Sequence, residues 1–291
     1  MKNNIVFCDG GLSNRLNSLI FSLILREKYG KEWEISWPIN NWCNANFNKL
    51  FSINMNVNLS TLSEYKNNEN DYTLLLHENQ INFNEQLIHY HRNCNSYDDY
   101  HSYLGINKPL FYYNNLIPNF VSNEDMKIAL SNLAISPFIL FEALNFCKTN
   151  EINNSVLGLH IRKTDFGNIV DDESLFNLVK NNEKRFFVCS DDYSVTEKFS
   201  NLDNCRVYKK KHYPKQLKAD KGWNDNIQDD QNRSFTFNIE RSEESIIEAL
   251  VDLLILSSTT QIQTSHSTFL KMSQIFKYIN ILYREGFYQH V

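Results

Sequence analysis

Charged and hydroxyl side chains gather at three places where an apolar run of the sequence ends. The first is His160-Ile161-Arg162-Lys163-Thr164-Asp165, the second is Ser190-Asp191-Asp192, and the third is Ser265-His266-Ser267-Thr268. A guanidinium such as that of Arg162 can hold a diphosphate through two parallel hydrogen bonds. Carboxylates can accept hydrogen bonds from a base or a ribose hydroxyl. Together the three clusters predict a pocket for a nucleoside diphosphate, although each cluster alone could equally be a solvated loop.

The elements that must position these clusters are short apolar strands followed by helices. Strands are predicted at residues 155–161, 185–190, 205–208 and 260–264, and helices at about 174–181, 194–200 and 243–257. A further helix is predicted to open at residues 265–268 and to run through Lys277. Such alternation predicts a parallel sheet with right-handed crossovers. The carboxyl ends of its strands then meet at one edge, which is where open α/β sheets bind ligands. A helix that begins after Ser265 would also offer free N–H groups to a phosphate.

The chain begins with a second strand, turn and helix unit. Residues 5–8 are apolar, Gly10 and Gly11 form a tight turn, and a helix is predicted with Ser13 as its cap and Gly30 as its stop. Glycines let the backbone approach a ligand closely, and the helix N-terminus favours anions. This turn lacks the spacing of an established phosphate loop, so it could also be an ordinary connection.

The remaining pattern divides the chain into two α/β halves. Further strands are predicted at residues 34–38 and 72–76, a helical stretch at 124–148 interrupted near Ser136-Pro137, and a last apolar segment at 279–283. Residues 97–113 are rich in Tyr, Asp and His, which favours aromatic packing over a sugar-binding cleft. Residues 209–237 are a long polar segment, and such loops are often functional. The polar stretch 149–155 marks the expected boundary.

Composition limits the class of protein. The chain has 291 residues with 42% hydrophobic side chains, enough for two domains. A net charge of −5 argues against a general nucleic-acid binder. The six cysteines are scattered without a metal-binding spacing, which favours free thiols in a reducing compartment. We expect no secretory leader and no transmembrane segment, and therefore a cytoplasmic protein.

The order of these motifs resembles the GDP-fucose-dependent fucosyltransferase superfamily, which includes α1,2-, α1,6- and protein O-fucosyltransferases. The resemblance rests on Gly10-Gly11-Leu12-Ser13-Asn14-Arg15-Leu16, on the block from His160 to Asp165, on Ser190-Asp191-Asp192, and on residues 249–269. It covers the first 30 or so residues and most of 155–276, and it leaves the middle of the chain unplaced. His-x-Arg-x-x-Asp is its most specific element.

The resemblance implies a GT-B-like fold with two Rossmann-like domains whose parallel sheets face one another across a cleft. Residues 1–150 would form the acceptor-side domain and 151–276 the nucleotide-sugar domain, with 277–291 packing back on the first domain. The implied reaction is inverting and needs neither metal nor cofactor. The partners would be a nucleotide-sugar donor and a glycan acceptor in surface polysaccharide or lipid-linked oligosaccharide synthesis, with no nucleic acid. Association with the membrane would be at most peripheral, through a membrane-linked acceptor.

The resemblance also implies roles for individual residues. Arg162 would hold the β-phosphate and stabilise the departing diphosphate, while His160 and Asp165 shape its loop. Asp191 or Asp192 would lie by the guanine or ribose. The side chains and backbone at Ser190, Ser265, Ser267 and Thr268 would contact the donor, and Gly10, Gly11, Asn14 and Arg15 would reach the pyrophosphate or the acceptor.

Two departures from the family pattern concern the chemistry. Lys163 stands where relatives often have a second Arg, and Ser13 stands where they often have Gly.

The base that deprotonates the acceptor is left open between Asp171 and Asp172, with Asp9 as a rival. A transferase with another nucleotide-sugar donor, or a non-catalytic nucleotide- or glycan-binding protein, would fit the same fold.

Overall fold

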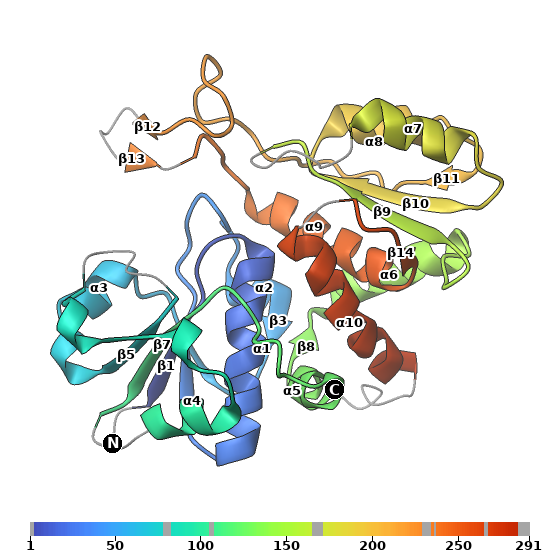
Figure 1. Ribbon diagram of the computed structural model, residues 1–291. Helices are drawn as coiled ribbons and strands as arrows, with labels where there is room; N and C mark the ends of the chain where they lie inside the picture. Colours follow the sequence, from blue (N-terminus) through green and yellow to red (C-terminus); the bar gives the residue numbers. More distant parts are fainter. Residues whose placement is uncertain are drawn as a thin grey trace. The chain divides into compact units, whose positions relative to one another are not determined.

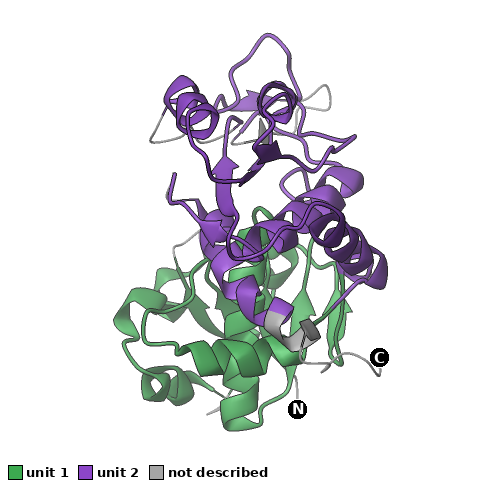
Figure 2. Ribbon diagram, turned by 90° about the vertical axis from the view of Figure 1, so that its right-hand side faces the viewer, with its two compact units in different colours: residues 1–39, 51–134, 286–291 green, residues 40–50, 135–285 purple. Residues whose placement is uncertain are grey.

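The computed structural model describes residues 3–77, 83–104, 108–164, 171–228, 234–235, 237–264 and 267–284. Within these residues the chain divides into two compact units, which are coloured separately in Figure 2. Unit 1 contains residues 3–39 and 51–134, and unit 2 contains residues 40–50 and 135–284. The predicted boundary near residue 150 differs from this division in two places, because helix α6 (Pro137–Thr149) and the early segment 40–50 both belong to unit 2.

Unit 1 is built on a sheet of parallel strands. Its order is β4 (Asn56–Asn58), β2 (Trp33–Ser36), β1 (Asn4–Phe7), β7 (Leu110–Tyr113), β5 (Thr73–Leu76) and β6 (Ile88–Tyr90). Every neighbouring pair is parallel. The chain adds β2 and β4 outward from β1 on one side. On the other side it forms β5 and β6 first, and β7 then takes the place between β1 and β5, so the direction of the order reverses between β1 and β7. That reversal is where a sheet of this kind opens to a ligand.

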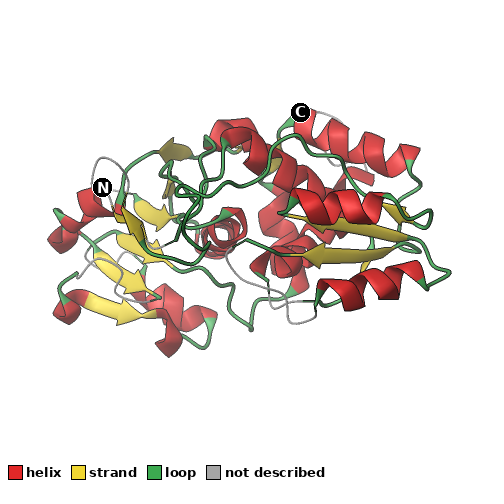
Figure 3. Cartoon of the chain, turned by 90° about the horizontal axis from the view of Figure 1, so that it is seen from above, coloured by secondary structure: helices red, strands yellow, loops and turns green. Residues whose placement is uncertain are grey.

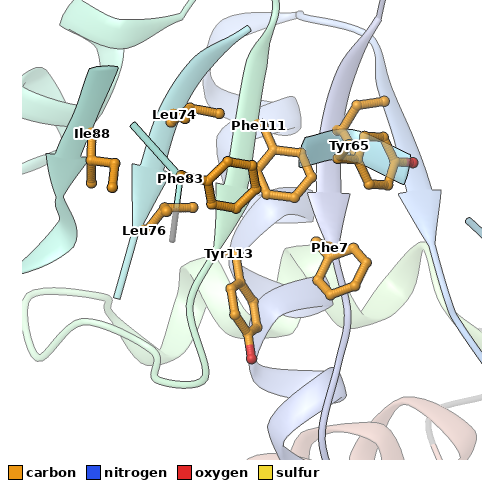
Figure 4. Packing of buried hydrophobic residues seen from close by; sticks show 9 residues of the cluster. Phe7, Tyr65, Leu74, Leu76, Phe83, Ile88, Phe111 and Tyr113 are labelled. Carbon is orange, nitrogen blue, oxygen red and sulfur yellow. The ribbon is translucent and has the colours of Figure 1, made fainter. Parts of the chain in front are cut away.

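The core of unit 1 lies on both faces of this sheet, because its inner strands β1, β7 and β5 are almost entirely buried. Phe7, Phe111 and Tyr113 pack with Tyr65 and Phe83 on one face (Figure 4). Tyr112 points to the opposite face, where its ring contacts Phe21 of α1 (Leu12–Tyr29). The shorter helices are α3 (Leu62–Lys66), α4 (Tyr97–Tyr103), α5 (Asn123–Ser131) and the 3₁₀ turns Glu69–Asp71, Glu85–Leu87 and His91–Asn93.

Unit 2 contains a second parallel sheet with the order β11 (Cys205–Arg206), β10 (Phe186–Ser190), β9 (Leu157–Ile161) and β14 (Thr260–Gln261). Helices lie on both sides of these strands (Figure 3). α7 (Asp172–Lys180) and α8 (Tyr193–Ser200) cover the face that carries Leu159 and Val188. α6 and α9 (Glu243–Ser257) pack with each other, α9 contacts β9 and β10, and Phe146 of α6 contacts Phe187 of β10. The remaining elements of the unit are α2 (Phe47–Leu50), α10 (Thr268–Arg284) and the antiparallel pair β12 (Ile227–Gln228) and β13 (Ser234–Phe235).

Gly158 allows α9 to approach β9 closely. A Cβ atom at Gly158 would collide with Thr259 Oγ1 and would lie 2.8 Å from Leu256 Cδ1. Leu256 lies in the last turn of α9 and Thr259 lies two residues beyond the helix. Since both are fully buried, neither can move away cheaply. The absence of a side chain therefore fixes how this helix end sits on the strand that leads into the His160 block.

The predicted class of fold, α/β with two parallel sheets, is confirmed, and most predicted elements exist within a few residues. Three expectations were wrong. Gly11, not Ser13, is the N-cap of α1, while Gly30 ends that helix with φ 61° as expected. Residues 279–283 are not a separate segment but continue α10. Residues 97–113, interpreted only as aromatic packing, contain helix α4 and the central strand β7. β3 (Phe51–Ser52) and β8 (Ala134–Ile135) lie where the chain passes between the units.

Candidate active site

The carboxyl ends of three parallel strands in unit 2 bring the predicted clusters to one edge of the sheet. β9 lies between β10 and β14, and the chain passes from β9 to β10 to β11 before it returns to the other side of β9 (Figure 1). The order of the strands therefore reverses between β9 and β14. A crevice at such a reversal is the usual ligand site of an open α/β sheet.

Hydrogen bonds tie the three strand ends together. Thr264 Oγ1, beyond β14, donates to the carbonyl oxygen of His160 at 2.6 Å. Asp191, beyond β10, accepts from the backbone N–H of Lys163 at 2.7 Å and from Thr164 Oγ1 at 2.5 Å. The loop that carries Arg162 is thus held from both neighbouring strands, and Arg162 itself is partly exposed.

Asp191 and Asp192 both have structural partners in addition to any predicted contact with a base or ribose. Asp191 fixes the Arg162 loop, as described above. Asp192 is the N-cap of α8, where its Oδ1 accepts from the N–H groups of Ser194 at 2.8 Å and Val195 at 3.2 Å. A carboxylate at this position also opposes the positive end of the helix dipole.

His160 is a buried, neutral member of the cluster. Its ring stacks on Phe269 of α10 with the centroids 4.6 Å apart. Burial lowers the pKa of His160 to about 4, against the opposing effect of the Asp191 carboxylate. Its Nδ1 atom is buried and has no hydrogen-bond partner among the described residues. His160 is therefore suited to shaping the loop and not to supplying a positive charge at neutral pH.

The hydroxyl groups near the site are arranged around backbone N–H groups. Ser190 Oγ accepts from the N–H of Asp192 at 3.1 Å, and Ser267 Oγ accepts from the N–H of Phe269 at 3.1 Å. Thr268 begins α10, a helix of 17 residues whose N-terminus is attractive to an anion. Asp165 and Ser265 lie outside the described residues, so their predicted roles stay predictions.

The candidate bases differ in their surroundings. Asp171 is the N-cap of α7 and accepts from Ser174 N at 2.9 Å and Ser174 Oγ at 2.6 Å. These hydrogen bonds hold the pKa of Asp171 below its usual value, which makes it a weaker base. Asp172 forms an ion pair with Lys163, from the Arg162 loop. Asp9 lies 3.7 Å from the guanidinium of Arg15.

The glycine turn of unit 1 lies at the reversal point of its own sheet, at the N-terminus of α1. Gly10 has φ 81°, a conformation that favours glycine. Arg15 is fully buried beneath this turn, where Nε donates to Gly10 O at 2.8 Å, Nη1 donates to Pro38 O at 2.6 Å, and the guanidinium lies over Trp37. In this structure Arg15 thus shapes the turn, whereas Asn14 is partly exposed beside it. The predicted contacts of both with a donor or an acceptor stay predictions.

Sequence reasoning missed a buried ion pair next to the site. Lys210 Nζ lies 2.8 Å from Asp252 Oδ2, and both side chains are more than nine-tenths buried. The available signal was Asp252 itself, a single carboxylate between Val251 and Leu253 in a helix that is otherwise apolar at its centre. A carboxylate is seldom buried without a partner.

Among the described residues, no group of three or more His, Cys, Asp or Glu side chains could hold a metal ion. Over the same residues, no helix combines the length and apolar character needed to cross a bilayer.

The architecture is that of a two-unit α/β protein whose two parallel sheets each contain a reversal of strand order. Comparison with known proteins shows which folds it resembles. No family model matches the sequence, and no curated protein does. Among solved structures, the chain is similar to fucosyltransferase NodZ from Bradyrhizobium, with a TM-score of 0.56 and 14% identity over 94% of this chain and 92% of that one. NodZ α-1,6-fucosyltransferase co-crystallised with GDP gives a TM-score of 0.52 at 14% identity, and the same enzyme soaked with GDP-fucose gives 0.50 at 15%. Each of these two comparisons covers 94% of this chain and 92% of the other. The resemblance inferred from the motifs is thus supported at the level of the fold.

Proposed function

We propose that this chain is an inverting, metal-independent glycosyltransferase that transfers fucose from GDP-fucose to a glycan acceptor. The observation that carries the proposal is the meeting of the Arg162 loop, Asp191 and the N-terminus of α10 at the reversal point of the unit 2 sheet. The fold shared with NodZ, which has been crystallised with GDP and soaked with GDP-fucose, supports the choice of donor.

In the proposed reaction the acceptor hydroxyl attacks the anomeric carbon of the sugar as the bond to the diphosphate oxygen breaks. Arg162 binds the diphosphate and stabilises the charge that develops on it, a role suited to a bidentate cation. The N–H groups at the start of α10 add a second, fixed source of positive potential. A carboxylate takes the proton of the acceptor. Of the two predicted candidates we prefer Asp172, since Asp171 caps α7 and its lowered pKa makes it the weaker base.

We further propose a cytoplasmic location and an acceptor from surface polysaccharide or lipid-linked oligosaccharide synthesis, reached at most peripherally at a membrane. The composition of the chain and the absence of a spanning helix among the described residues are compatible with this location.

The test begins with the nucleotide. Thermal unfolding is followed with GDP, UDP, CDP and ADP, because a ligand that binds only the native state raises the melting temperature. We expect the largest rise with GDP; a response to UDP alone would remove the fucose donor from the proposal.

The second stage follows chemistry. Wild-type protein is incubated with GDP-fucose and a glycan library in the presence and absence of EDTA, and products are detected by mass spectrometry. We expect transfer in both conditions, with an anomeric configuration opposite to that of the donor by NMR. Nucleotide binding without transfer or donor hydrolysis would instead favour a non-catalytic binding protein.

A further inference from the structure

The buried pair Lys210 and Asp252 connects helix α9 to the polar segment that follows β11. The ammonium and carboxylate are 2.8 Å apart, and the two side chains are only 6% and 3% exposed. The Asp252 carboxylate raises the pKa of Lys210 although burial alone would lower it, and burial raises the pKa of Asp252 to about 6. Both groups are therefore charged at neutral pH.

A buried ion pair of this kind is not expected to stabilise the fold more than two apolar residues would. Removing two charges from water is costly, and apolar residues of similar volume often stabilise a protein as well or better. Asp252 Oδ1 is buried and has no hydrogen-bond partner among the described residues, so the carboxylate is only half satisfied. Packing alone therefore does not explain why Lys210 and Asp252 are buried here.

The remaining contacts of Lys210 lead to the candidate active site. Its Nζ also donates to the carbonyl oxygen of Ser190, the last residue of β10. The next residue is Asp191. One oxygen of its carboxylate accepts from the backbone N–H of Lys163, and the other accepts from the hydroxyl of Thr164. A continuous series of polar contacts thus runs from α9 through Lys210 and the end of β10 to the Arg162 loop.

α9 holds the same segment at a second point, one turn earlier. Glu248 accepts from the backbone N–H groups of Lys211 at 2.9 Å and His212 at 2.8 Å. Because Glu248 and Asp252 are four residues apart, they lie on one face of the helix. The position of Lys210 is therefore determined by its backbone as well as by its charge.

We propose that Lys210 and Asp252 are positioning residues that hold the carboxyl end of β10, so that Asp191 keeps the Arg162 loop in the conformation that receives a diphosphate. They act through Ser190 and Asp191. The part of this proposal that concerns a ligand rests on the proposed function, whereas the part that concerns the loop does not.

The test replaces the pair with uncharged residues of similar size, Lys210→Met together with Asp252→Leu. The double variant leaves no unpaired buried charge, so its thermal transition should stay close to that of the wild type. Hydrogen exchange is then measured on the protein without ligand, in peptides that report the amide of Lys163. We expect exchange there to be about five- to tenfold faster, which corresponds to the net loss of one hydrogen bond. GDP affinity, measured by calorimetry, should fall by a similar factor.

A matched control neutralises the exposed pair on α7 and α8 of the same unit, Glu173→Gln with Lys198→Gln. It should change neither the exchange at Lys163 nor the affinity for GDP. An Asp191→Ala background provides a second check, because replacing the pair there should add nothing further to the exchange rate.

Unchanged exchange at Lys163 in a folded double variant would overturn the positioning role, as would a double variant without a cooperative thermal transition, which would make the pair a requirement of the fold itself. If wild-type protein fails to bind GDP, the proposed function is wrong, and the exchange rate still decides whether the pair positions the loop.

Discussion

Replacing Gly158 with Ala should destabilise unit 2, because the added methyl group has no room between β9 and the buried residues at the end of α9. The new Cβ would collide with Thr259 Oγ1, and it would lie 2.8 Å from Leu256 Cδ1 and 3.0 Å from Thr259 Cβ. Thr259 is fully buried, and its hydroxyl already donates to the carbonyl oxygen of Leu256 at 2.7 Å. Relief therefore requires α9 or β9 to move, not merely a side chain to rotate.

Overpacking of this kind costs about 1–3 kcal/mol, and a collision with a fixed, buried group places the cost near 3 kcal/mol. At roughly 2–4 °C for each kcal/mol in a unit of this size, the melting temperature should fall by about 6–12 °C. Urea denaturation and thermal unfolding measure the change directly. GDP affinity should fall as well, since β9 carries the Arg162 loop at its end.

Gly222→Ala is the matched control, because a Cβ there would meet nothing closer than the Asp225 carboxylate at 3.4 Å, an ordinary contact. It should alter stability by less than about 0.5 kcal/mol, as most surface substitutions do. A loss below 1 kcal/mol for Gly158→Ala, or a loss equal to that of the control, would refute the close approach of α9 to β9.

Substitutions at three further positions test the site. Arg162→Ala should weaken GDP binding in calorimetry by about 10- to 150-fold, the effect of 1.5–3 kcal/mol from charged hydrogen bonds, while the thermal transition stays within about 2 °C; wild-type affinity or transfer would remove Arg162 from the proposed role. Asp192→Ala should cost about 1 kcal/mol in urea denaturation through loss of the α8 cap, whereas Asp192→Asn should cost little; equal losses would argue against capping. Because the pKa of His160 falls from 6.5 to about 4 on folding, the unfolded chain binds the proton first, and stability should decline as the pH drops below 6.5, by about 2 kcal/mol at pH 5. His91 of unit 1 titrates in the same direction, so the contribution of His160 is the part of this decline that His160→Phe removes.

The second half of the chain was predictable because its strands are short apolar runs that end abruptly in charge. β9 and β10 lie within two residues of their expected ranges, and α9 was predicted with its observed ends. Parallel pairing then places their carboxyl ends together, which is why the three clusters could be expected to meet.

The middle of unit 1 was not predictable in the same way. β7 is the sequence Leu-Phe-Tyr-Tyr, which has no polar alternation and follows a tyrosine-rich helix, so aromatic character concealed a central strand. Contacts between residues far apart in the sequence could not be predicted either. Nothing local shows that Arg15 turns toward Pro38, or that Lys210, one of three consecutive lysines, is the one that becomes buried.

The early segment 40–50 has a consequence for the way the protein is made. Asn41 exchanges backbone and side-chain hydrogen bonds with Ile239 and Arg241, and Trp42 packs against Phe237. These partners are separated by about 200 residues, so a growing chain exposes Trp42 long before its docking surface exists. Unit 2 is therefore expected to complete its folding only near the end of synthesis. A fragment that starts at residue 135 would lack a segment that its own unit needs, so the two units cannot be produced separately by a single cut.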